Sequence, residues 1–314
     1  MTTYGADQEA AMGRQPEMED HDRHSSGDDN RHRLLAAIPI AERRLHLAGV
    51  STAVLEGGEG PPVVLLHGPG EFAAKWLRII PDLVTTHRVI APDLPGHGTS
   101  ELIEGPLDAD RVLTWLSELI EHTCTSPPAL VGHVLGGAIA ARFAIDHSDR
   151  LDRLVLVDTL GLGRFRPTPR FALTMIGFLA RPTEGNYDRF MRQCSYDLEG
   201  LREEMGERWE PFQAYNLDRA RTPSVKAASR RLMLSVGVPV IPPEHLGRID
   251  VPTTLIWGRY DRANRLRIAE AASERYGWPL HVIDNCADDP PRDQPEAFLE
   301  TLHTTLGSTH GFEE

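Results

Sequence analysis

Residues 130–140, LVGHVLGGAIA, decide the fold of this chain. The apolar run that ends at His133 is typical of a buried strand, and the small residues that follow are typical of a helix packed closely against it. Gly132 and Gly136 lie two residues before and after Val134, so the backbone can turn sharply and the helix can approach the strand. The stretch therefore predicts a strand, a tight turn with Val134 at its tip, and a helix.

The same alternation of strands and helices extends outward from this turn in both directions. Short apolar runs predict strands, and longer segments with apolar residues three and four apart predict helices. The predicted strands are 43–49, 51–57, 61–68, 87–93, 129–133, 151–158, 251–258 and 279–284, and the predicted helices are 71–84, 107–123, 135–147, 265–277 and 295–306. Strands that alternate with helices favour a mostly parallel sheet with helices on both faces.

The alternation stops between residues 160 and 248, which are helical in pattern and rich in aromatic residues. We predict a helical lid here, inserted between two parts of one core at 34–159 and 249–314. Phe171 and Met175 lie on one face of a predicted helix. Two interpretations of that face stay open: the core of a small helical subdomain, and the lining of an apolar pocket.

Composition sets limits on location and partners. Residues 1–33 are polar and charged, so we predict a disordered tail. The net charge of −13 argues against binding nucleic acid or anionic lipid through a general electrostatic field. The sequence has no apolar run as long as a membrane span and no signal-peptide pattern at its N-terminus. We therefore expect a cytoplasmic protein with no membrane and no nucleic-acid partner.

The cysteines give no sign of a metal or redox site. Cys124, Cys194 and Cys286 are odd in number and far apart, and no Cys-x-x-Cys pair occurs. Buried thiols are the better interpretation, and we expect no metal and no other cofactor.

The order of elements and five motifs together resemble the α/β-hydrolase superfamily over residues 34–310. The motifs are VVLLHGPG at 63–70, APDLPGHGTS at 91–100, VGHVLGG at 131–137, LIWGRYD at 255–261 and DQPEAF at 293–298. The resemblance implies an α/β-hydrolase fold: a mostly parallel eight-stranded sheet with helices on both faces and a helical lid. It also implies a turn at 132–136 that holds a nucleophile in relatives.

Only one member of the superfamily's Ser-acid-His triad is in place. Asp261 matches the acid, but Val134 stands where the serine is expected, and its side chain has no lone pair to donate. The histidine position corresponds to Asp288, seven residues before Pro295. The chain therefore has a degenerate triad of Val134, Asp261 and Asp288, and its catalytic side chains stay unknown.

The resemblance also indicates where a substrate would bind. In the superfamily, the N–H after the nucleophile and an N–H of the preceding His-Gly loop stabilise a developing oxyanion. Here the first donor is Leu135; Pro69 has no N–H, so the hole is complete only if Gly70 supplies the second. The predicted substrate-binding residues are Gly70, Glu71, Phe72, His133, Val134, Leu135, Phe165, Phe171 and Met175.

Other residues near the motifs have two interpretations each. His97 and His133 are better explained as structural residues than as substitute nucleophiles. Asp288 can face Asp261 across the former triad, which would raise one pKa and give an acid/base. The alternative, which we favour slightly, is that Asp288 is a solvated turn residue.

Loss of the triad on an intact scaffold leaves three functional hypotheses. The first is a non-hydrolytic epimerase or isomerase, because the sequence resembles the atypical epimerases of ribosomal-peptide biosynthesis of the bottromycin kind. That resemblance implies an aspartyl residue beside a thiazoline as substrate, with the substrate's own carboxylate as base. Arg164, Arg166 and Arg170 are candidates to pair with a substrate carboxylate, against simple solvated charge. The other hypotheses are a ligand-binding pseudoenzyme and a hydrolase with an unconventional nucleophile or base.

Overall fold

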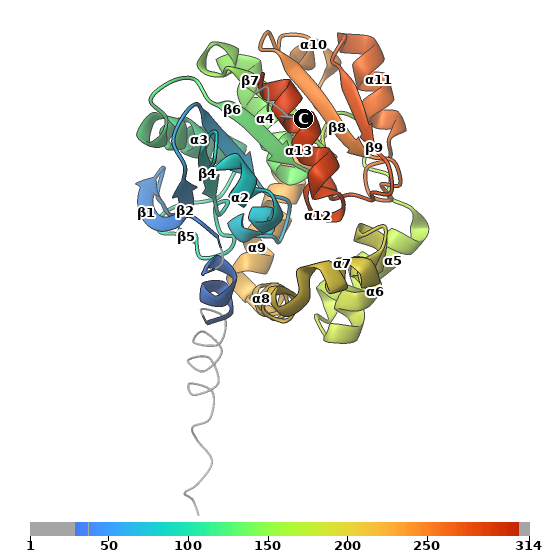
Figure 1. Cartoon of the computed structure of the whole chain (residues 1–314). Coiled ribbons are helices and arrows are strands. Elements are labelled where there is room, and N and C mark those ends of the chain that lie inside the picture. The colour runs from blue at the N-terminus through green and yellow to red at the C-terminus, as the bar shows by residue number, and fades with distance from the viewer. Residues whose placement is uncertain (1–28, 37, 308–314) are drawn as a thin grey trace, which may run out of the picture.

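A twisted, mostly parallel sheet forms the centre of the molecule (Figure 1). The structure is a computed structural model, and it describes residues 29–36 and 38–307. The strands follow the order β1-β2-β4-β3-β6-β7-β8-β9, and β5 pairs with β2. Their bounds are β1 Ala41–Leu47, β2 Val50–Gly57, β3 Pro62–Leu66, β4 Arg88–Pro92, β5 Glu101–Leu102, β6 Ala129–His133, β7 Arg153–Val157, β8 Thr253–Gly258 and β9 Leu280–Ile283.

The predicted α/β-hydrolase fold is confirmed, with one strand more than the eight expected. The extra strand, β5, has two residues and pairs with Val50 and Ser51 of β2. β1, β2 and β4 pair antiparallel, and every pair from β4 to β9 is parallel. A two-residue strand has too little periodicity to be recognised from sequence.

Helices cover both faces of the sheet because the strands bury side chains in both directions. In β3, Val63 and Leu65 belong to one apolar cluster, whereas Val64 and Leu66 belong to the other. One face is covered by η1 Ala73–Arg78, α2 Ile80–Leu83 and α13 Pro295–Leu306, and the other by α3 Ala109–Thr123, α4 Leu135–His147 and α11 Arg267–Tyr276. The short elements η2 Ser148–Arg150 and α12 Pro290–Asp293 complete the core.

The segment between β7 and β8 is mainly helical, and we call it the lid. Its helices are α5 Pro169–Ala180, α6 Glu184–Cys194, α7 Leu198–Met205, η3 Gly206–Arg208, α8 Trp209–Arg221, α9 Pro223–Leu232, η4 Met233–Gly237 and α10 Pro243–Leu246. α5 to α9 gather at one end of the sheet, and α9 leads back toward the core (Figure 1).

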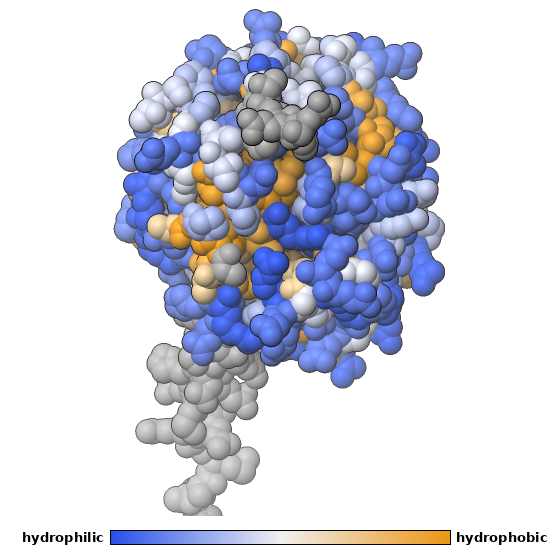
Figure 2. All heavy atoms as spheres, in the orientation of Figure 1, coloured by the Kyte–Doolittle hydropathy of each residue, from blue (hydrophilic) through white to orange (hydrophobic). Residues whose placement is uncertain are grey.

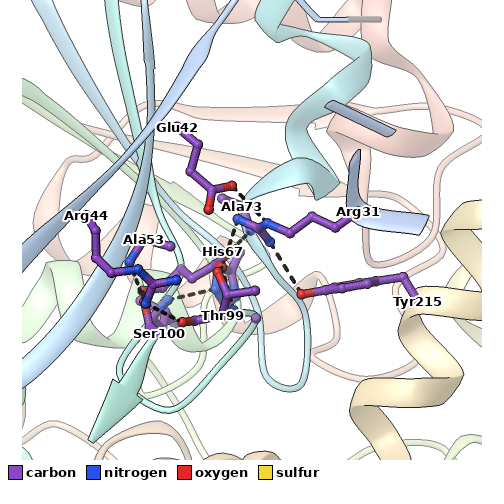
Figure 3. Close-up of polar contacts among 12 residues, drawn as sticks. Arg31, Glu42, Arg44, Ala53, His67, Ala73, Thr99, Ser100 and Tyr215 are labelled. Atoms are coloured by element: carbon purple, nitrogen blue, oxygen red, sulfur yellow. Dashed lines mark hydrogen bonds and ion pairs between the residues drawn. The ribbon is translucent and has the colours of Figure 1, made fainter. Parts of the chain in front are cut away.

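Residues 29–33 are ordered, so the predicted disordered tail at 1–33 is wrong for its last five residues. Residues 29–35 form a helix in which Leu34 is fully buried and Arg31 is only 4% exposed. Arg31 meets Glu42 of β1 at 2.9 Å, Asp93 at 3.0 Å and the hydroxyl of Tyr215 in α8 at 3.4 Å (Figure 3). Partners from three distant segments order this polar stretch, and no local pattern reveals them. Residues 1–28 lie outside the described residues.

One face of the molecule shows how polar and apolar side chains are distributed on the surface. The face seen in Figure 2 is mostly polar, with apolar side chains gathered in separate patches. Within residues 29–36 and 38–307, no helix has both the length and the apolar content that crossing a membrane requires.

Candidate active site

The turn between β6 and α4 has the geometry that the sequence predicts. Val134 adopts φ 49° and ψ −101°, a region that β-branched residues rarely enter. A Cβ on Gly132 would lie 2.5 Å from the Gly136 carbonyl oxygen, and a Cβ on Gly136 would lie 2.2 Å from that of Leu66. Both glycines are therefore required, and the turn places a partly exposed valine at its tip.

Backbone donors lie on both sides of this tip. The loop after β3 is tied to α4 by the Gly136 N–H, which donates to the His67 carbonyl at 3.1 Å. The N–H groups of Gly70 and Leu135 donate to no acceptor within the described residues. The Gly68 N–H, by contrast, donates to Glu71 Oε2 at 2.8 Å. The expected oxyanion donors are thus free, which is what stabilising a negative oxygen requires.

The lid lies directly over this turn and loop. A Cβ on Gly96 would meet that of Ala228 in α9 at 2.4 Å, and a Cβ on Gly70 would have only the Ser229 hydroxyl within 4 Å. A Cβ on Gly237 of η4 would meet Leu135 at 3.3 Å. The lid therefore contacts the core beside the turn, whereas the space around Gly70 is open. A cavity of about 280 Å³ lies elsewhere, between α7 and α12, and no residue of the turn lines it.

Lys75 is buried beside the turn in a cluster of charged groups. Its ammonium donates to His133 Nδ1 at 2.5 Å and lies 3.2 Å from Asp289 Oδ1 and 3.4 Å from Glu71 Oε2. Although burial opposes ionisation, the Lys75 charge holds the pKa of Glu71 well below its ordinary value. Glu71, His133 and Asp289 have the spacing of metal ligands, but the ammonium already lies among them.

Both histidines near the motifs have structural surroundings. His133 bonds to Lys75 with one ring nitrogen and, at 2.7 Å, to the Asp288 carbonyl oxygen with the other. His97 is fully buried, and burial lowers its pKa to about 3. These surroundings favour the structural interpretation over that of a substitute nucleophile.

Three carboxyl groups lie where the acid and histidine of a triad are expected. Asp261, after β8, accepts from the N–H groups of Ala263 and Asn264, both at 2.7 Å. Asp158, after β7, accepts from the Gly258 N–H at 3.0 Å. Asp261 Oδ2, Asp158 Oδ2 and Asp288 Oδ1 are buried and have no hydrogen-bond donor. A buried carboxyl oxygen without a donor disfavours the ionised form and therefore raises the pKa of its group.

The pKa values of these carboxyl groups follow from their burial. Burial raises the pKa of Asp261 to about 6, against its two backbone hydrogen bonds. Burial and the nearby Asp261 charge raise the pKa of Asp288 and of Asp158 well above the usual range. The interpretation of Asp288 as a solvated turn residue is wrong, because it is only 9% exposed. Burial and the neighbouring Asp261 charge favour the alternative, a carboxyl pair with one raised pKa, which stays a prediction.

Four residues of this region are not among those predicted from the sequence: Lys75, Asp158, Asp289 and Arg292. Arg292 lies 3.0 Å from Asp289 Oδ2 and 3.7 Å from Glu71 Oε1. One signal was available, because Asp158 directly follows a buried parallel strand, and the carboxyl ends of such strands form the site in open α/β sheets. The other three come from segments whose proximity only the fold reveals.

The predicted lid residues lie mainly within lid packing. Phe171 is buried against Phe190 of α6, with ring centroids 5.4 Å apart, and Phe165 and Met175 are partly buried. Phe72 packs on Tyr215 of α8 with centroids 4.3 Å apart. These contacts favour subdomain packing, and contact with a substrate stays a prediction. The arginines at 164, 166 and 170 are exposed.

Comparisons with known proteins point in one direction. A family model described as the Alpha/beta hydrolase family matches residues 63–301. The chain is 26% identical over 266 residues to the pimeloyl-(acyl-carrier protein) methyl ester esterase of Aeromonas hydrophila, covering 82% of this chain and 100% of that enzyme. It is 33% identical over 218 residues to the 2-hydroxy-6-oxo-6-phenylhexa-2,4-dienoate hydrolase of Comamonas testosteroni, covering 66% of this chain and 73% of that enzyme.

A solved structure agrees with these sequence relatives. The 2-hydroxy-6-oxo-6-phenylhexa-2,4-dienoate hydrolase of Rhodococcus sp. strain RHA1 superimposes with a TM-score of 0.75 at 27% identity. The match covers 85% of this chain and 99% of that chain. The relatives named here are all hydrolases of small molecules or acyl esters.

Proposed function

The chain belongs to the alpha/beta hydrolase family, and we propose that it is an enzyme of this family that works without a serine nucleophile. The reaction we infer is proton transfer at the carbon next to a carbonyl group, that is, epimerisation or isomerisation. The substrate is a small molecule or a modified peptide held between sheet and lid.

The observation that carries this proposal is the combination of Val134 at the nucleophile position and Asp288 at the histidine position. Valine cannot form a covalent acyl intermediate, so this turn cannot support the two-step mechanism of serine hydrolases. The histidine position nevertheless holds a titratable group, a buried carboxyl beside Asp261. A site with oxyanion donors and an acid/base, but no nucleophile, is suited to forming an enolate.

The proposed steps need only groups of this chain and the substrate. The substrate carbonyl oxygen accepts hydrogen bonds from the N–H groups of Leu135 and Gly70. A carboxylate removes the α-proton, the C–H electron pair forms the enolate, and the negative charge moves to the carbonyl oxygen. Return of a proton to the opposite face inverts the centre. Burial raises the pKa of both Asp261 and Asp288, so in this proposal a protonated member of the pair returns the proton to the carbon.

Substrate identity is the finer part of the proposal. We propose an aspartyl residue beside a thiazoline, the substrate implied by the resemblance to bottromycin-type epimerases. In this form of the proposal, the side-chain carboxylate of the substrate's own aspartyl residue acts as the base. The raised pKa of Asp288 supports this, because an ionised neighbour would repel a second carboxylate, whereas a protonated one donates a hydrogen bond to it.

Isotope exchange tests the proposal directly. We expect a thiazoline-containing aspartyl peptide in deuterium oxide to gain one carbon-bound deuteron faster with the protein than without it, measured by mass spectrometry. Asp288→Asn should slow this exchange by about a hundredfold, the usual worth of a positioned acid/base. Asp284→Asn, in an exposed loop, serves as the matched control.

A different result would contradict the proposal. If the peptide gains the mass of water and no carbon-bound deuteron, the protein is a hydrolase. If it raises the melting temperature of the protein without any chemical change, the site binds without catalysis.

Hydrolysis is the second candidate, and the relatives favour it, since they are hydrolases. In that reaction an ionised Asp288 would activate a water molecule for direct attack on the carbonyl, with no covalent intermediate. Burial of Asp288 predicts that such activity rises with pH as the carboxyl ionises.

A further inference from the structure

Helix α5 of the lid is apolar on the side that faces away from the protein. Its inner side packs on α6, where Phe178 and Phe190 stack with ring centroids 5.6 Å apart. Leu173, Ile176 and Leu179 are 71%, 59% and 53% exposed. A spacing of three residues places them on successive turns of the outward surface. α5 lies at the outer edge of the lid, where no other element covers it (Figure 1).

The surroundings of this helix are basic, although the whole chain has a net charge of −13. Residues 159–183 contain four arginines and no acidic residue. The four arginines, at 164, 166, 170 and 181, are exposed, and none forms an ion pair with a described residue. The exposed leucines and isoleucine therefore lie on a segment of the chain with net positive charge.

We propose that this surface, which we call the α5 face (Leu173, Ile176 and Leu179 with the four arginines), binds an anionic lipid bilayer. Its chemistry is that of an interfacial helix, whose apolar side chains enter the acyl boundary while cationic groups pair with lipid phosphates. The inference goes beyond the proposed reaction and does not depend on it. It replaces the expectation of no membrane partner, which rested on the field of the whole chain.

The shape and charge of the α5 face argue against other occupants. The face is a convex helix surface, and the hydroxyl of Thr174 is already bonded to the Arg170 and Phe171 carbonyl oxygens, both at 3.0 Å. Apart from the arginines, it offers no free polar group for specific recognition by a folded partner. A symmetric contact between two copies would bring the same arginines together. A fluid anionic lipid bilayer can accommodate both the convex apolar surface and the positive charge of the α5 face.

Co-sedimentation with vesicles tests the inference on the full chain. We expect binding to equimolar phosphatidylglycerol and phosphatidylcholine, little binding to phosphatidylcholine alone, and weaker binding at higher salt. Each arginine changed to glutamine, as in Arg170→Gln, should lower the partition coefficient about fivefold. Ile176→Ser should lower it as well. The matched controls are Ile103→Ser, at an exposed isoleucine (54%) outside the lid, and Arg275→Gln in α11.

The outcomes separate the possible occupants. Unchanged melting temperatures will show that the variants fold, as expected for exposed side chains. Equal loss in the controls, or no binding of the wild-type chain to anionic vesicles, overturns the proposal. A concentration-dependent dimer that Ile176→Ser abolishes, without vesicle binding, would assign the α5 face to a second copy and likewise overturn it.

Discussion

Val134 keeps the backbone of a nucleophile turn without the group that such a turn presents. Its φ of 49° strains a β-branched residue, and such strain is typically of the order of 1–3 kcal/mol. The turn persists because Gly132 and Gly136 permit close packing and because Leu160 donates to the Val134 carbonyl at 3.2 Å. The turn is thus kept around a side chain that offers no nucleophile.

Restoring the triad tests the assignment of positions. Val134→Ser alone should not hydrolyse 4-nitrophenyl acetate, because no histidine is placed to activate the serine. The double variant Val134→Ser, Asp288→His should gain hydrolysis at least tenfold above either single variant, since Asp261 can then orient the new histidine. An organophosphonate probe should label only the double variant. Equal activity or labelling in the single Val134→Ser variant would show that Asp288 does not occupy the histidine position.

At the scale of elements, the loops after β7 and β8 bring two carboxyl groups together. Asp158 and Asp261 are both buried, and the charge of Asp261 adds to the burial that raises the pKa of Asp158. Burial raises both pKa values, so the folded protein binds protons more tightly than the unfolded chain. Each such group lowers stability as pH rises from the unfolded pKa to the folded one.

Asp261→Asn should therefore stabilise the protein at high pH. The amide oxygen can still accept from Ala263 and Asn264, and its NH₂ can donate to Asp158. With a folded pKa of about 6 for Asp261, we expect a gain of about 1–3 kcal/mol in the free energy of unfolding at pH 8 and little gain at pH 4. Urea denaturation at both pH values measures it. A gain that is equal at both values would contradict the raised pKa.

The helices and strands show which features of the fold can be predicted from sequence patterns. Eight strands were predictable because each has a continuous or alternating apolar run, which most of them bury over most of their length, the mostly exposed β1 being an exception. The predicted helix at 71–84 is divided into η1 and α2, because Pro81 lacks an N–H and begins a new helix. Asp261 and Asp288 were predictable from motif positions. Their burial, and the cluster around Lys75, depend on loops from distant strands, so no local pattern could reveal them.

At the scale of the whole molecule, Arg31 joins three parts that are far apart in sequence. It lies between β1, the loop after β4 and α8 of the lid, and Asp93 accepts from the Ala73 N–H at 2.7 Å next to the predicted oxyanion loop (Figure 3). The Arg31 charge holds the pKa of Asp93 below its ordinary value against the effect of burial. The N-terminal helix therefore stabilises the interface of core and lid.

Arg31→Met should leave the Asp93 carboxylate buried without its cation. Breaking a buried ion pair in this way costs about 3–5 kcal/mol of unfolding free energy. Hydrogen exchange should also increase in α8, since Tyr215 loses its donor. Arg43→Met, at an exposed ion pair in β1, is the matched control and should cost about 1 kcal/mol or less. Equal effects of the two variants would contradict the role of Arg31.

The contact between Arg31 and Tyr215 also affects the order in which parts of the protein fold during synthesis. The two residues are 184 positions apart. A ribosome adds about 5–20 residues per second, so Arg31 is made on the order of ten to forty seconds before its lid partner exists. Through that interval the core strands can pair, but the N-terminal helix cannot complete its contacts. Among the first described residues to be synthesised are thus some of the last to reach their final place.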